Sequence, residues 1–165
     1  MTSLALALTV VTLALAGAMA GFFYAYSMSV MWALDAVDPK AAIAAMQSIN
    51  IVVRNAIFVP AFFGTPVVAF IAAGLWWKQD AGLVALLLAL AAIVYLAGTF
   101  LVTIVANVPM NEALAIATIP ADPEQARTLW QNYSGPWTLW NHVRTIASFA
   151  SLLLVGWALY AAGQA

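Results

Sequence analysis

A short polar segment near the C-terminal end of the chain carries residue types that suit acid–base chemistry. Residues 137–145 read Trp-Thr-Leu-Trp-Asn-His-Val-Arg-Thr and contain the chain's only histidine, His142, together with Arg144. Histidine exchanges a proton near neutral pH, and arginine stabilises a negatively charged oxygen. The stretch that follows is strongly apolar, where polar groups are costly. We therefore expect Asn141, His142 and Arg144 to belong to a functional site.

A second set of polar residues lies in another apolar stretch. Five of them recur at intervals of four: Tyr95, Thr99, Thr103, Asn107 and Asn111. This spacing places them along one side of a helix, and that side must face protein because the other sides are aliphatic. The threonines could serve packing alone by bonding to carbonyls of their own helix. The amides of Asn107 and Asn111 have more hydrogen-bonding groups to satisfy, so we expect them to face Asn141 and Arg144.

The composition indicates which elements must position these residues. The chain has 165 residues, of which 66% are hydrophobic and 7% charged. Four windows have no charged side chain: residues 2–34, 55–77, 81–111 and 145–165. Each reaches the roughly 20 residues that a helix needs to cross the hydrocarbon core of a bilayer. A segment in lipid must satisfy its own backbone, and the alternation of a barrel is absent. We predict an all-α integral membrane four-helix bundle, a single domain over residues 1–165, with spans at approximately 4–34, 56–77, 82–108 and 139–162.

The connection between the first two spans predicts an additional helix. Asp38 and Pro39 supply an N-cap acid and a proline at the first helical position, and no helix breaker follows before Arg54. The sequence therefore predicts an amphipathic interfacial helix. If it lies on the bundle, Asn50 points inward and Arg54 points toward water or headgroups.

The connection between the last two spans repeats this pattern. Asp122 and Pro123 again resemble a helix start, and Ser134-Gly135-Pro136 resembles a break. We predict a short helix ending near Tyr133 before the last span begins. Within the third span, Pro109 is expected to interrupt the helix because proline has no N–H to donate.

The positions of the basic residues predict an orientation. Lys40, Arg54, Arg127 and Arg144 lie in or beside the first and third connections, whereas Lys78 lies alone in the second. Basic connections favour the cytoplasm. We therefore expect a multi-pass protein of the cell membrane, a bacterial inner membrane, with both termini outside. Arg144 should be discounted in this reasoning if it belongs to a site.

Several kinds of partner and chemistry can be excluded or left open. The net charge of −1 argues against a nucleic-acid partner, and the absence of cysteine excludes disulfides and thiolate chemistry. One histidine without a carboxylate inside a span cannot make an ordinary metal site. We expect no metal site and no required cofactor, with heme or copper left open. Membrane lipids are expected neighbours. Gly17 and Gly21 allow close approach of another helix, and a homo-oligomer is left open.

These elements together predict a pocket near one membrane face. Its expected substrate-binding residues are Phe22, Tyr24, Tyr26, Asn50, Thr103, Trp137, Trp140 and Thr145. Simpler interpretations exist for some residues. The tryptophans are also typical of an interfacial aromatic belt, Arg144 could extend to the headgroups, and His142 could be a hydrogen-bonded residue at a helix end.

Four motifs of the chain resemble the DUF1772 family, the anthrone oxygenase-like family of four-helix membrane proteins. They are residues 21–27 (GFFYAYS), 45–50 (AMQSIN), 107–111 (NVPMN) and 137–145 (WTLWNHVRT). The motif positions carried over are Asn107, Asn111, Trp140, Asn141, His142 and Arg144. Some fungal members are linked to oxidation of polyketide anthrones to anthraquinones, so the resemblance implies a comparable oxidation and a hydrophobic aromatic or quinone-like molecule as the ligand of the pocket.

The implied reaction assigns roles to these residues. Removal of a proton from the CH₂ group of an anthrone gives an electron-rich enolate that can react with O₂ without a metal. His142 is the expected base. Arg144 with Asn107, Asn111 or Asn141 is expected to stabilise the enolate oxygen, and aromatic side chains to hold the rings. The competing interpretation is a non-catalytic protein, or an accessory subunit of a membrane complex, that holds a quinone, lipid or heme in the same pocket.

Overall fold

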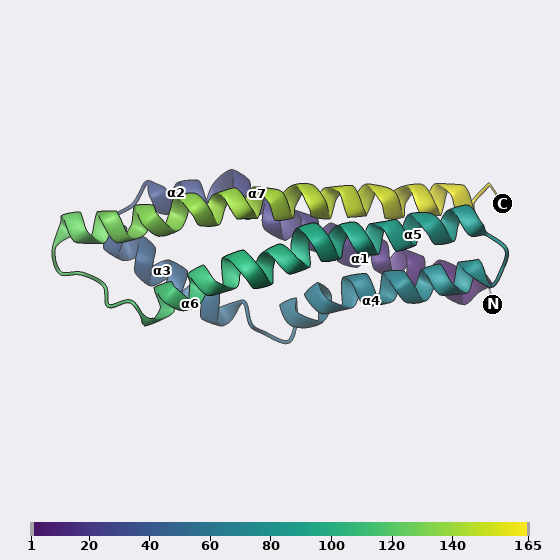
Figure 1. The fold of residues 1–165 in the computed structure, drawn as a ribbon, viewed down its shortest axis with the longest axis horizontal. Coiled ribbons are helices and arrows are strands. Elements are labelled where there is room, and N and C mark those ends of the chain that lie inside the picture. Colours follow the sequence, from purple (N-terminus) through teal and green to yellow (C-terminus); the bar gives the residue numbers. More distant parts are fainter. Residues whose placement is uncertain (1, 165) are drawn as a thin grey trace.

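The computed structural model describes residues 2–164, and within this range every regular element is helical. Four helical rods run side by side, with one further helix between the first two rods (Figure 1). The elements are, in chain order, α1 (Thr2–Ala25), the π-helical turn η1 (Tyr26–Val30), α2 (Met31–Asp35), α3 (Pro39–Val52), α4 (Phe58–Trp77), α5 (Gly82–Tyr95), the π-helical turns η2 (Leu96–Leu101) and η3 (Thr103–Asn107), α6 (Val108–Ile116) and α7 (Pro123–Ala162). The four rods are Ser3–Asp35, Phe58–Trp77, Gly82–Ile116 and Pro123–Ala162, and each is long and apolar enough to cross a membrane. The predicted multi-pass helical bundle is confirmed.

The rods differ in length, and this difference divides the molecule into two halves. The 20 residues of α4 span about 30 Å, whereas the 40 residues of α7 extend for about twice that length. Figure 1 shows α4 in the half that contains both termini and α3 in the other half, where it lies beside α6 and α7. The chain therefore passes from α3 to α4 near the middle of the long rods.

The expected helix starts are present. The Asp38 carboxylate accepts hydrogen bonds from the backbone N–H groups of Lys40 and Ala41 at the start of α3. The Asp122 carboxylate accepts one from Gln125 N–H at the start of α7. On α3, Asn50 is buried and Arg54, just beyond its end, is exposed.

Two expected helix breaks are wrong. No short separate helix precedes the last span, because α7 continues without interruption through Pro136. The third rod likewise continues through Pro109 to Ile116, beyond the expected end at residue 108. Pro136 removes one backbone hydrogen bond from α7. Trp130, Tyr133 and Trp137 lie on both sides of Pro136 and pack in one buried cluster, and this packing keeps α7 continuous. Pro109 lies in the first turn of α6, directly after η3, where its missing N–H costs little.

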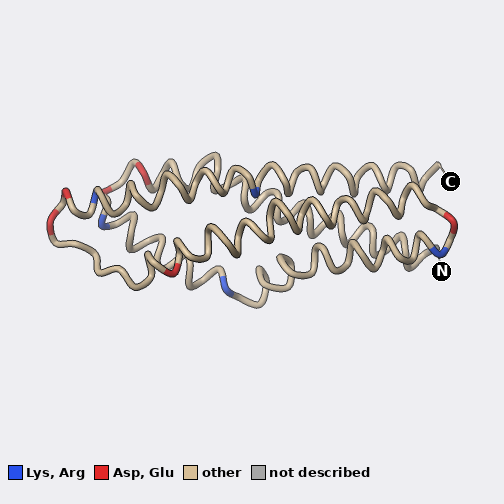
Figure 2. The backbone as a smooth tube through the Cα atoms, in the orientation of Figure 1, with Lys and Arg blue, Asp and Glu red and all other residues tan. Residues whose placement is uncertain are grey.

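Charged residues are confined to few places in this fold. Figure 2 shows them at the two ends of the molecule and near its middle, with long uncharged helical stretches between. One basic residue, Arg144, lies within the uncharged part of α7 and is buried. Its surroundings define the site.

Candidate functional site

Arg144 is a buried cation without an acidic partner. Its side chain is on α7 and the residue is only 5% exposed. The guanidinium donates to Asn141 Oδ1 at 2.8 Å and, more weakly, to Thr103 Oγ1 at 3.4 Å. Its Nε has no hydrogen-bond partner. The ion pairs found in residues 2–164 join other groups and lie at exposed positions, so the Arg144 charge is not neutralised by a carboxylate there.

Aromatic rings enclose the Arg144 guanidinium. Its central carbon lies 4.6 Å from the centroid of the Phe23 ring and 4.9 Å from that of Trp137. Such cation–π contacts stabilise a charge in apolar surroundings, but they leave its hydrogen-bonding capacity free. The lack of an anionic partner within residues 2–164 favours an external acceptor for the guanidinium, most simply a negatively charged oxygen.

Asn141 and Ser27 hold the Arg144 side chain from the side of the first rod. Asn141 Nδ2 donates to the Phe23 carbonyl and to Ser27 Oγ, both at 2.8 Å. Ser27 Oγ also lies 3.0 Å from Thr145 Oγ1, and all of these side chains are buried. Ser27 belongs to the π-helical turn η1. Turns of this kind are frequent at functional sites because they shift the register of a helix locally.

The third rod contributes the row of polar side chains that the four-residue spacing predicts. Thr99 Oγ1 lies 2.9 Å from Ser148 Oγ and donates to the Arg144 carbonyl at 3.3 Å. Asn107 Nδ2 donates to the Trp137 carbonyl at 3.2 Å, while its Oδ1 has no partner. Two consecutive π-helical turns, η2 and η3, cover this region. A π turn holds more residues than an α turn and offsets the drift of a four-residue spacing. The polar side, which comprises Tyr95, Thr99, Thr103, Asn107 and Asn111, is buried or half-buried throughout.

Asn111 fixes the aromatic wall beside Arg144. Its Oδ1 accepts hydrogen bonds from Tyr133 Oη and from Trp137 Nε1, both at 2.8 Å. Asn50 Nδ2 lies 3.5 Å from the same Tyr133 oxygen. One amide oxygen thus orients the ring that lies against the Arg144 guanidinium.

These side chains surround a cavity of about 190 Å³. The expected site residues that line it are Phe22, Tyr26, Asn50, Thr103, Asn111, Trp137 and Arg144. Its remaining walls are mostly apolar, and they include Phe58, Phe62 and Phe63 of α4. The structure therefore brings together seven of the expected residues from three rods and α3.

The structure leaves three of the expected residues outside the cavity. His142, Tyr24 and Trp140 are exposed and do not line it. The reason is helical geometry: two residues correspond to about 200° of rotation, so His142 and Arg144 point to nearly opposite sides of α7. The His142 side chain is hydrogen-bonded to Ser27, with Nδ1 2.9 Å from Ser27 Oγ, and Ser27 connects it to Asn141. Tyr24 instead makes an edge-to-face contact with Phe149.

Three other expected residues lie behind the cavity wall. Asn107, Asn141 and Thr145 are buried and do not line the cavity, and they bond to groups that form or orient the wall. Asn107 and Asn141 act on Trp137 and Arg144 directly. We interpret them as positioning residues.

Sequence reasoning missed the contribution of α4. Phe58 and Phe62 stack with centroids 5.5 Å apart, and Phe62 stacks on Phe100 at 5.4 Å. The signal was present, since residues 58–63 contain three phenylalanines at the start of a span. An aromatic residue at a span end is usually taken as an interfacial anchor, which hides a role in a cavity.

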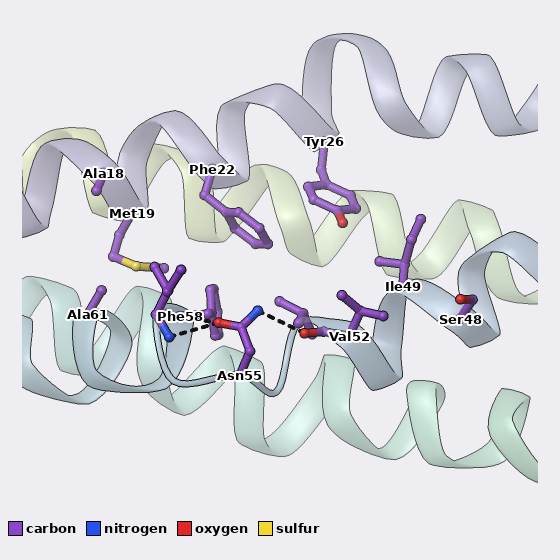
Figure 3. A pocket seen from close by; sticks show the side chains of 12 residues that line it. Ala18, Met19, Phe22, Tyr26, Ser48, Ile49, Val52, Asn55, Phe58 and Ala61 are labelled. Atoms are coloured by element: carbon purple, nitrogen blue, oxygen red, sulfur yellow. Dashed lines mark hydrogen bonds between the residues drawn. The ribbon is translucent and has the colours of Figure 1, made fainter.

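A larger groove adjoins the cavity. It has a volume of about 530 Å³ and lies between α1, the end of α3 and the start of α4. Figure 3 shows Phe22 and Tyr26 pointing from the first rod into this space, toward Asn55 and Val52. Phe22, Tyr26, Ile49, Val53 and Phe58 line both the groove and the cavity, so the two spaces adjoin along these side chains.

Within residues 2–164, no group of three or more histidine, aspartate or glutamate side chains converges where it could hold a metal ion.

Comparison with known proteins identifies the family of the chain. No curated protein and no solved structure matches the chain. A family model described as anthrone oxygenase matches residues 50–154, a segment that contains Asn107, Asn111, Asn141 and Arg144. The chain belongs to the anthrone oxygenase family of DUF1772 membrane proteins.

Proposed function

We propose that the protein is a cofactor-independent oxygenase that binds a flat aromatic ketone at Arg144 and stabilises its enolate for reaction with O₂. The observation that carries this proposal is the buried Arg144 guanidinium, which lines the cavity and has no carboxylate partner within residues 2–164. A preorganised cation in a water-poor site stabilises negative charge that develops during a reaction. The ketone oxygen of the substrate would be the missing acceptor.

The reaction balances with O₂ as the only oxidant. Loss of one proton from the CH₂ group opposite the ketone gives the enolate, and transfer of one electron to O₂ gives a carbon radical and superoxide. Their combination forms a C–O bond, and protonation yields a hydroperoxide. Loss of water from the hydroperoxide breaks the O–O bond and the remaining C–H bond, which leaves the second carbonyl. One anthrone and one O₂ thus give one anthraquinone and one H₂O.

The cavity walls support binding of flat rings. Trp137 and Tyr26 lie with ring centroids 5.5 Å apart, and Phe22 lies 4.9 Å from Phe58. Aromatic faces attract one another in offset or tilted arrangements, so a planar substrate gains contacts that a globular one lacks. The apolar surroundings also suit O₂, which dissolves well in lipid.

The identity of the base remains a prediction. His142 lies outside the cavity and reaches the polar cluster through Ser27. Ser27 does not line the cavity either, so we propose that His142 acts on the site through a hydrogen-bonded series that runs from Ser27 to Asn141 and on to Arg144. The role of Arg144 does not depend on this path.

We also propose the membrane orientation expected from charge. Lys40 and Arg127 lie near the starts of α3 and α7, in the half distant from the termini, and Arg54 follows α3 near the middle of the molecule, while Lys78 follows α4 near the termini. Basic residues favour the cytoplasmic side. Both termini would then lie outside a bacterial inner membrane.

Turnover of anthrone by purified protein tests the function. Detergent-solubilised protein should form anthraquinone in air faster than buffer and detergent alone, with one O₂ consumed for each product. A rate equal to that of buffer, measured with protein that binds anthrone, would replace the oxygenase by the alternative of a quinone- or lipid-binding protein.

A further inference from the structure

The groove beside the Arg144 cavity is large enough to hold part of a ligand. Small-molecule sites usually measure about 300–1,000 Å³. The cavity alone, at about 190 Å³, falls below this range, whereas the adjoining groove adds about 530 Å³. A ligand with its polar group at Arg144 would reach the groove by displacing the rings of Phe22 and Phe58, whose centroids lie 4.9 Å apart on the shared wall.

The groove offers almost no polar partner to such an extension. Its lining is aliphatic and aromatic except for Ser48, Asn55 and the Tyr26 hydroxyl. The Asn55 side chain is already engaged, since Oδ1 accepts from Ile57 N–H at 2.8 Å and from Phe58 N–H at 2.9 Å, and Nδ2 donates to the Val52 carbonyl at 2.8 Å. The Asn55 side chain thus supplies hydrogen bonds to backbone groups in the connection between α3 and α4. What the groove recognises is hydrocarbon.

The outer border of the groove is also apolar. Val52 is 66% exposed and Ile57 is 85% exposed at this border. Both residues lie just before the span that begins at Phe58, and exposed Arg54 lies between them in the sequence, so this border lies at the end of the apolar span. A hydrocarbon chain in the groove would therefore enter it at that end of the span.

We propose that the groove holds the apolar tail of an amphiphilic substrate whose oxygenated aromatic head lies at Arg144. The substrate class is then a fused-ring ketone or hydroxyquinone with an alkyl or isoprenoid side chain, which reaches the site from the membrane. This inference rests on the proposed function in one respect, the placement of the head at Arg144. The tail site itself rests on the size and apolar lining of the groove and on the side chains that it shares with the cavity.

Two probes with the same head test the tail site. The first is 2-hydroxy-1,4-naphthoquinone, an anion at neutral pH, and the second is its 3-undecyl derivative. Dissociation constants of both are measured by calorimetry with the full chain in one detergent. Partition into micelles is the same for every variant, so it cancels when the ratio of the two constants is compared between variants.

The groove is filled by Ala18→Trp and, independently, by Val52→Trp, both at exposed positions that tolerate a large side chain. We expect each to reduce the affinity gain from the tail about tenfold relative to wild type, the equivalent of about 1.4 kcal/mol. Ala7→Trp is the matched control, because Ala7 is an exposed residue of α1 that lines neither space. It should leave the gain unchanged.

The outcomes separate the two proposals. An unchanged gain in both groove variants, or no gain in wild type, would overturn the tail site even if the head binds. Equal binding of both probes by wild type and Arg144→Met would instead overturn the placement of the head. Failure of wild type to bind either probe would overturn both.

Discussion

Replacement of Arg144 by methionine should separate function from stability. Methionine has a similar length and no charge, so it fills the space without the burial of a cation. The wild-type residue makes one short charged hydrogen bond, to Asn141 Oδ1 at 2.8 Å, and two cation–π contacts. A charged hydrogen bond contributes about 1.5–3 kcal/mol, and each cation–π contact contributes about 0.5–2 kcal/mol.

The opposing effect is of similar size. Burial of an ion without a counter-ion costs several kcal/mol even after the structure relaxes. The losses and the gain in Arg144→Met should therefore nearly cancel, and the variant should unfold within about 2 kcal/mol of wild type. Its rate of anthraquinone formation should nevertheless fall about 10²–10³-fold, the usual effect of removal of one group that stabilises an oxyanion.

Thermal unfolding in detergent and the rate of anthraquinone formation are measured on the same preparation. Arg127→Met is the matched control, because Arg127 is exposed on α7, pairs with Glu124 at 3.7 Å and lines neither the cavity nor the groove. It should change neither quantity appreciably. A large loss of stability in Arg144→Met, with the rate per folded molecule preserved, would show that Arg144 serves the fold instead of the reaction.

Three further results are expected. Gly98→Ala should destabilise the protein by about 1–3 kcal/mol, because the added Cβ would overlap the Cβ of Ala147. Gly156→Ala should be tolerated, because its added Cβ meets open space. Equal shifts of the denaturation midpoint in the two variants would contradict this packing argument. His142→Ala and Ser27→Ala should each lower the oxidation rate by a similar factor if the hydroxyl links the imidazole to the cavity, and a deficit in only one of them would break the link. Purified protein should turn over anthrone without metal or heme, and loss of activity after metal chelation or an absorption band of heme in the active preparation would contradict this.

Part of the fold followed from the sequence because the bilayer restricts what a chain can do. Uncharged windows give spans, and the carboxylates of Asp38 and Asp122 mark helix starts that the structure confirms. The break expected before Pro136 failed because a local rule about proline was applied where tertiary packing decides. The buried cluster around Trp130 and Trp137 keeps α7 continuous there, and contacts between distant segments are not visible in a local pattern.

The sequence predicts several of the residues that line the cavity but not how they are arranged around it. Polar residues at costly positions in the third and fourth spans led to Arg144 and Asn111, which the structure brings to one cavity. Helical geometry predicts His142 and Arg144 on the two flanks of the face that carries Asn141, and only the Arg144 flank faces the cavity. The contribution of Phe58 depends on where α4 begins, and this does not follow from residue types alone.

The central claim is that Arg144 awaits a negatively charged oxygen. The most direct measurement compares the affinity of wild-type protein for 2-hydroxy-1,4-naphthoquinone, an anion at neutral pH, with that for its neutral 2-methoxy analogue of nearly equal size. A charged hydrogen bond to a buried guanidinium predicts a preference of at least about tenfold for the anion. This preference should disappear in Arg144→Met. Equal affinity of the wild-type protein for the two compounds would contradict the account.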